Sequence, residues 1–72
     1  MPAKVIYTRL LEDEELRAHL EQRDLLVFKG LGRAWQDIER QVERLSFGDE
    51  YIVSQTGSKT GDTKVSPLRD AQ

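Results

Sequence analysis

The feature that most restricts the fold of this chain is a stretch at residues 34–45 in which apolar residues recur three and four positions apart. Residues with that spacing lie on one side of an α-helix, so the pattern predicts an amphipathic helix. Gly48 is expected to end this helix in the left-handed conformation that glycine adopts readily. An apolar face of this kind suits a protein core, and it also suits a seam between two helices of a dimer. The apolar positions are Ala34, Trp35, Ile38, Val42 and Leu45.

Other short apolar segments are typical of β-strands. Residues 4–10 (KVIYTRL) are rich in β-branched and aromatic side chains, Leu25–Phe28 is a continuous apolar run, and Tyr51–Val53 follows later. Between the first two segments, the acidic run Glu12–Glu15 begins a helix, because carboxylates favour the positive end of the helix dipole. The chain order is therefore predicted as β-α-β-α-β.

This order predicts a small α+β or α/β domain, with a three-stranded sheet packed by two helices. The connections are long enough for right-handed crossovers between parallel strands, and an antiparallel third strand fits equally well. The globular domain is expected to occupy residues 1–55. Residues 56–72 contain Gly57, Gly61 and Pro67 and few apolar side chains, which predicts a flexible tail or a loose hairpin.

The composition places the chain among small soluble proteins. Its 72 residues include no cysteine, which excludes disulfides and thiolate metal sites and indicates a reducing compartment, so a cytoplasmic location is expected. No apolar run is long enough to cross a membrane, and no membrane partner is expected. A domain of this size is marginally stable, and an open sheet of this kind leaves free edges. Both features favour oligomers.

The segment FKGLGRAW, which ends at Trp35, has the order of strand, glycine turn and helix start that phosphate-binding loops share. A dinucleotide-binding fingerprint needs a small residue where Trp35 stands, and a Walker loop needs Gly-Lys-Ser/Thr, so both motifs fail. The favoured interpretation is a tight connection in which Gly30 or Gly32 has a positive φ. The alternative is an anion- or nucleotide-binding turn. Its residues would be Lys29, Gly32 and Arg33.

No group of residues points to catalysis. The single histidine, His19, lies one helical turn after Glu15, but a stable metal site needs more ligands than these, and a solvent-facing role is expected. No serine stands in a nucleophile-elbow pattern. The prediction is a protein that is not an enzyme, with no catalytic residues, no metal and no cofactor.

The expected function is that of a small binding or adaptor protein that acts through protein–protein contacts. Its partner is expected to be a second copy, which gives a homo-oligomer, or another protein. The alternative is a nucleic-acid-binding regulator that uses the helix at residues 34–45, although a net charge of −2 argues against it. The predicted interface residues are Trp35, Ile38, Val42, Tyr51 and Val53, and the nucleic-acid or anion alternative rests on Lys29, Gly32, Arg33, Arg40 and Arg44.

Overall fold

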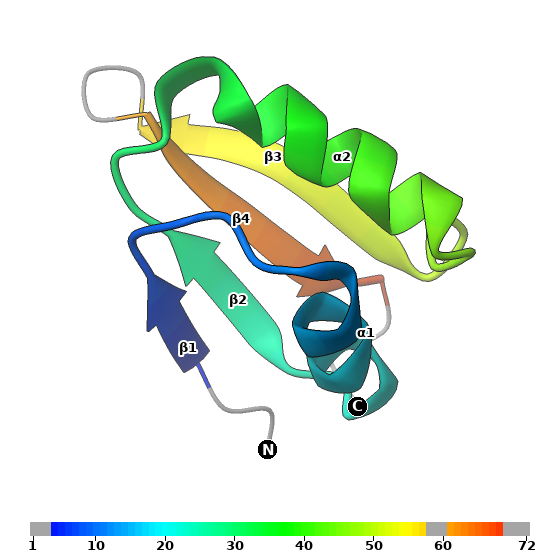
Figure 1. Ribbon diagram of the computed structural model, residues 1–72. Coiled ribbons are helices and arrows are strands. Elements are labelled where there is room, and N and C mark those ends of the chain that lie inside the picture. Colours follow the sequence, from blue (N-terminus) through cyan, green and yellow to red (C-terminus); the bar gives the residue numbers. More distant parts are fainter. Residues whose placement is uncertain (1–3, 58–60, 69–72) are drawn as a thin grey trace.

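The computed structural model describes residues 4–57 and 61–68 and has two layers. A mixed β-sheet forms one layer, and a pair of helices that cover one face of the sheet forms the other (Figure 1). The strands are β1 (Lys4–Tyr7), β2 (Leu25–Phe28), β3 (Tyr51–Gly57) and β4 (Asp62–Pro67). The helices are α1 (Asp13–Glu21) and α2 (Trp35–Arg44), with a short 3₁₀ turn, η1 (Gly32–Ala34), before α2. No described helix is long and apolar enough to cross a membrane.

The sheet order is β1-β2-β4-β3, so β4 lies inside the sheet while β1 and β3 form its edges. β1 and β2 are parallel neighbours, and the chain passes through α1 between them. β4 is antiparallel to both β2 and β3. The prediction of an α+β domain with two helices is therefore confirmed.

The fourth strand corrects the prediction of a three-stranded sheet, and it lies in the segment predicted as a flexible tail or a loose hairpin. Residues 62–67 form β4, and the predicted boundary at residue 55 falls inside β3. β4 is hard to recognise because its inward side is carried by Thr63, Val65 and Pro67, of which only Val65 is strongly apolar. The other residues assigned to the tail, 58–60 and 69–72, lie outside the described part of the chain.

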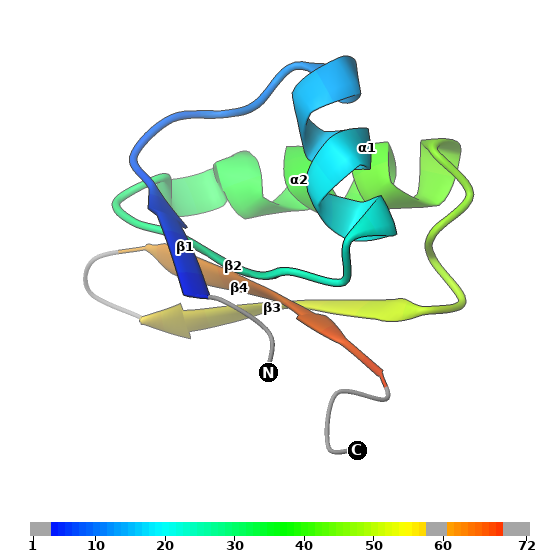
Figure 2. The same cartoon turned by 90° about the horizontal axis from the view of Figure 1, so that it is seen from below.

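The core lies between the helices and the covered face of the sheet, as Figure 2 shows from the side. Leu16 and Leu20 of α1 are buried, and so are Ile38 and Val42 of α2, which confirms the apolar face expected for the helix at residues 34–45. They pack against the strand residues that point toward the helices. The buried apolar residues are Leu11, Leu16, Leu20, Leu26, Phe28, Ile38, Val42, Leu45, Tyr51 and Val65.

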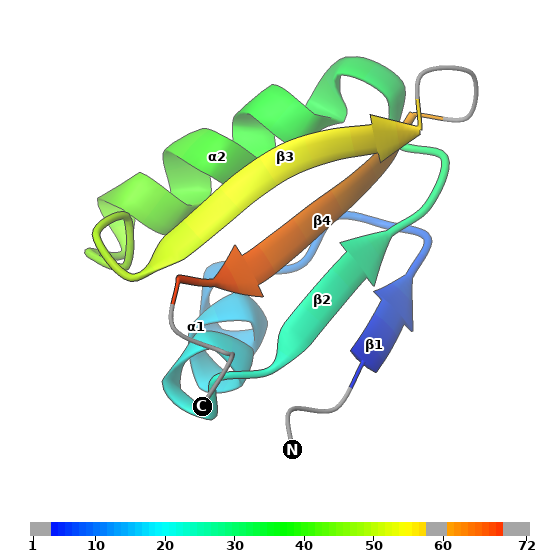
Figure 3. The same ribbon diagram turned by 180° about the vertical axis from the view of Figure 1, so that it is seen from behind.

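The opposite face of the sheet carries no helix (Figure 3). Its side chains alternate along each strand with those of the core. Ile6 and Ile52 are 53% and 49% exposed, and Lys4 and Lys64 are exposed as well. Val27 is paired with Lys64 across neighbouring strands. This face is therefore amphipathic, with lysines between its aliphatic side chains.

Both helices end on a residue with left-handed backbone that is not glycine. At the end of α2 the N–H of Phe47 donates to the carbonyl of Val42, which makes a Schellman motif around Ser46 at a φ of 70°. The prediction that Gly48 is the left-handed cap was wrong, because the chain already turns two residues earlier. α1 ends in the same way around Arg23, at a φ of 61°.

Candidate functional site

The β3 edge is the part of the sheet most open to a partner. β3 has seven residues, and no described strand lies on its outer side. Its sequence, YIVSQTG, contains no charged residue and no proline. Natural sheets protect free edges with charges, prolines or short strands, so a long uncharged edge is available for pairing. The opposite edge, β1, is shorter, with four residues, and it carries Lys4.

A groove runs along this edge between α2 and β3, and we call it the β3 groove. Its volume is about 230 Å³. Figure 1 shows α2 lying along β3, so one wall of the groove is a helix and the other is the edge strand. A strand added to β3 would therefore lie beside α2. The groove is lined by Glu39, Val42, Glu43, Gly48, Tyr51, Ile52 and Val53.

The structure divides the predicted interface residues into two groups. Ile38 and Val42 are each 1% exposed and Tyr51 is 4% exposed, so they belong mainly to the core. Trp35 and Val53 are half-buried and keep surface that a partner can contact. Spacing along a helix marks a core face and a docking face alike, which is why the sequence cannot separate the two groups.

Two groove residues that the sequence analysis missed are Glu39 and Ile52. Glu39 belongs to the charged side of a helix, where a carboxylate is ordinary, and only the position of α2 over β3 turns it toward a groove. Ile52 lies in a predicted strand, but the sequence does not show which residues of that strand face solvent and which face the core. Its neighbours Tyr51 and Val53 point toward the helices, whereas the side chain of Ile52 lies on the face of the sheet without helices, where it is 49% exposed beside the edge.

Tyr51 anchors β3 to the helix layer. Its hydroxyl donates to the backbone carbonyl of Leu20 at 2.9 Å, close to the end of α1. Burial raises the pKa of Tyr51 to about 12, because the phenolate would lose its hydration. The edge strand is thus held in place from its inner side, which leaves its outer side unpaired among the described residues.

The glycine turn between β2 and α2 has the geometry expected from the sequence, with a φ of 72° at Gly30 and 59° at Gly32. The N–H of Gly30 donates to Asp62 Oδ1 at 3.2 Å, and Lys29 Nζ lies 3.7 Å from Asp62 Oδ2. A Cβ at Gly61 would lie 2.4 Å from the nitrogen of Gly32, so β4 begins directly against this turn. A carboxylate of the protein itself therefore occupies the place where an external anion was considered.

The α2 arginines that a nucleic-acid interface would use are engaged within the protein. Arg40 Nη2 lies 2.8 Å from Asp37 Oδ1, and Arg44 Nη2 lies 2.8 Å from Asp13 Oδ1. Arg33 is exposed and belongs to η1, before the start of α2. The structure does not bring these arginines together as an unpaired basic stripe.

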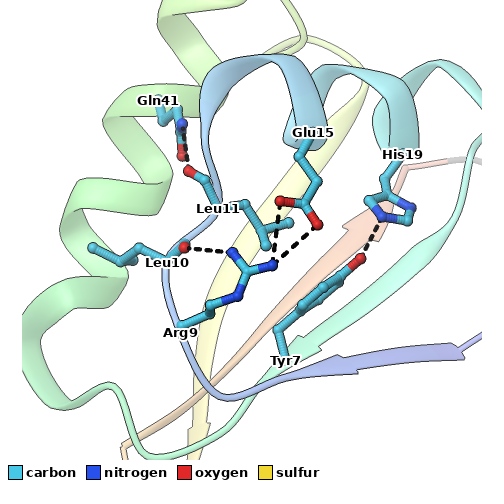
Figure 4. Close-up of polar contacts among 7 residues, drawn as sticks. All are labelled: Tyr7, Arg9, Leu10, Leu11, Glu15, His19 and Gln41. Carbon is cyan, nitrogen blue, oxygen red and sulfur yellow. Dashed lines mark hydrogen bonds and ion pairs between the residues drawn. The ribbon is translucent and has the colours of Figure 1, made fainter.

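Gln41 ties α2 to the start of α1. Its Nε2 donates to the carbonyl of Leu11 at 3.1 Å (Figure 4) and to Asp13 Oδ1 at 2.6 Å. Hydrogen bonds from Gln41 and Arg44 lower the pKa of Asp13 below its ordinary value of 3.8. This side of α2 is therefore committed to contacts with α1, while its other side faces the β3 groove.

His19 is the centre of a polar cluster, so the prediction of a solvent-facing side chain was wrong (Figure 4). The Tyr7 hydroxyl is hydrogen-bonded to His19 Nε2, and His19 Nδ1 lies 2.8 Å from Asp24 Oδ2. Desolvation, with the nearby charge of Glu15, raises the pKa of Tyr7. Both imidazole nitrogens have internal partners, so the cluster links β1, α1 and the segment before β2. In the described residues, no group of three or more His, Cys, Asp or Glu side chains could hold a metal ion.

Comparisons with known proteins found no match to this chain among protein-family models, curated proteins or solved structures.

Proposed function

We propose that this chain is a non-catalytic binding protein that adds a partner's strand to the β3 edge of its sheet. The observation that carries the proposal is the uncharged, seven-residue β3 at the end of the sheet. The unpaired N–H and C=O groups of an edge strand supply affinity in such an interaction, and the side chains beside the edge supply selectivity. In this chain those side chains line the β3 groove.

Binding fits the arrangement of polar groups better than catalysis does. The cluster of Tyr7, His19 and Asp24 has the chemical groups of a proton relay, but they are bonded to one another. A general base needs a free nitrogen or oxygen within hydrogen-bond reach of a substrate. The contacts of this cluster instead hold three elements of the fold together.

A second copy of the chain is one partner that fits the edge. Two β3 strands related by a two-fold axis pair in the antiparallel direction, and no charged residues of β3 oppose one another. The sheet then continues across the interface, with the helices of both copies on the same side. This arrangement gives a homodimer in which Ile52 and Val53 lie where the two β3 strands pair.

The first test is the solution mass of the protein across a concentration series, measured by light scattering after size exclusion. We expect a mass above the 8.3 kDa monomer that rises with concentration. Ile52→Lys should return the mass to that of the monomer, because a lysine on an edge strand opposes pairing. The matched control is Ile6→Lys, which places the same charge on the β1 edge at a similarly exposed isoleucine.

The two variants separate pairing at β3 from general solubility effects. If Ile6→Lys abolishes association while Ile52→Lys leaves it intact, the chain pairs through β1 and the proposal is wrong. A monomeric mass for the wild-type chain at every concentration removes the second copy as the partner of β3.

A further inference from the structure

The charges on α2 are divided between its two sides. Arg40 and Arg44 are paired with Asp37 and Asp13. The other side carries Glu39 and Glu43, which line the β3 groove and form no ion pair within the described residues. None of the residues that line the groove is a lysine or an arginine. The wall beside the edge strand is therefore acidic.

We propose that the β3 groove selects an extended protein segment with lysine or arginine at alternate positions, an inference that rests on the proposed function. Such a segment pairs its backbone with β3 and directs every second side chain toward α2. The basic side chains on that side then meet Glu39 and Glu43. Strand addition alone would accept many segments, and the acidic wall of the groove favours the basic ones.

The spacing of the two carboxylates suits this partner. Glu39 and Glu43 are four residues apart on a helix, which separates them by about 6 Å along its axis. Alternate residues of an extended strand are about 6.7 Å apart, so consecutive basic side chains on one side of the strand reach consecutive carboxylates. Trp35 lies one further turn toward the start of α2 on the same side. Trp35 is half-buried, so it keeps surface that a third basic side chain can contact.

A second copy of the chain is a weaker partner for the same groove. Its β3 brings no basic residue, and its own Glu39 and Glu43 would approach their equivalents across the two-fold axis. Like charges at an interface disfavour the wrong partner. We therefore expect self-association to need high concentration and a basic segment to bind at lower concentration.

The test titrates the ¹⁵N-labelled protein with two blocked heptapeptides, Thr-Lys-Thr-Lys-Thr-Lys-Thr and its counterpart with glutamate in place of lysine. The lysine peptide should shift the amide signals of residues 51–57, and the glutamate peptide should leave them unchanged. The double variant Glu39→Lys with Glu43→Lys should reverse the preference, so that the glutamate peptide binds more tightly than the lysine peptide. Ion pairs near the protein surface contribute little each, so the loss of two should lower the affinity for the lysine peptide by roughly five- to tenfold.

The control is Glu14→Lys with Glu21→Lys, which makes the same change in net charge on exposed positions of α1. It should keep the preference for the lysine peptide. Equal shifts of the β3 amide signals with both peptides would overturn the selection of a basic segment, but they would still support strand addition at β3. Shifts confined to other elements, or no shift with either peptide, would overturn both proposals. A preference that also exchanges in the α1 variant would show that net charge alone sets it.

Discussion

Thr63 is the residue at which the core departs most clearly from apolar packing. It is fully buried in β4, and its hydroxyl oxygen has no hydrogen-bond partner among the described residues. Leaving such a group unpaired costs about 1–3 kcal/mol, so Thr63→Val should raise the free energy of unfolding by about 1 kcal/mol in urea denaturation. Thr56→Val, at an exposed position of the neighbouring strand, should change it little. A loss of stability in Thr63→Val would mean that the hydroxyl has a partner.

Tyr51 makes the stability of the protein depend on alkaline pH. Its pKa is raised from 10.0 to about 12 in the folded protein, so the unfolded chain releases the proton first. The stabilisation is complete below pH 10 and is lost as the pH rises from 10 to about 12. Tyr51→Phe should remove this loss and cost about 1 kcal/mol at neutral pH, because the hydrogen bond to Leu20 is gone.

The measurement that checks this is the free energy of unfolding of both proteins between pH 8 and 11, followed by urea denaturation. Other groups with alkaline pKa values, including Tyr7, are present in both proteins, so only the difference between the two curves reports on Tyr51. A difference that stays constant across this range would contradict the assignment.

The conformation or the contacts of some single residues could be predicted from the sequence, and those of others could not. A positive φ at Gly30 or Gly32 was predicted, because a strand followed at once by a helix needs a turn that few other residues adopt, and both glycines have one. The partners of His19 could not be predicted. Tyr7 and Asp24 reach it from 12 and 5 positions away, through the placement of β1 and of the end of α1.

Among the elements, each of the two helices ends at a residue whose backbone conformation destabilises the folded protein. Ser46 and Arg23 have the left-handed backbone, which costs a residue with a side chain about 1–2 kcal/mol relative to glycine. Ser46→Gly should therefore stabilise the protein by about 0.5–1 kcal/mol, with part of the gain offset by the greater freedom of glycine in the unfolded chain. The control Ser46→Ala keeps the Cβ atom and should bring no gain in thermal denaturation. Equal effects of the two variants would exclude backbone strain as the cause.

Elements with a strong apolar period could be predicted, and β4 could not. The two helices and the cores of β1, β2 and β3 follow from helical spacing and from short apolar runs. β4 owes its central place to its partners, since it is hydrogen-bonded to β2 on one side and β3 on the other. Thr63 and Pro67 are buried there because the neighbouring strands and the helices surround them. No pattern within the sequence of β4 predicts this burial.

At the scale of the whole molecule, the position of β4 decides what the candidate site is. Because β4 occupies the centre, β3 becomes an edge with α2 beside it, and Asp62 at the start of β4 closes the glycine turn. β3 lies at an edge of the sheet, and it contains Tyr51 and Val53, two of the predicted interface residues. The acidic wall of the groove depends on how α2 is rotated over β3, which the sequence leaves open.

A dilution series of ¹⁵N–¹H correlation spectra of the wild-type chain tests directly whether the β3 edge pairs with another strand. Pairing at the β3 edge predicts shifts that grow with concentration in residues 51–57 and on the side of α2 that carries Glu39 and Glu43. The same shifts should be absent in Ile52→Lys. Concentration-dependent shifts confined to β1 or to the bare face of the sheet, at Lys4 or Lys64, would exclude β3 as the edge that pairs.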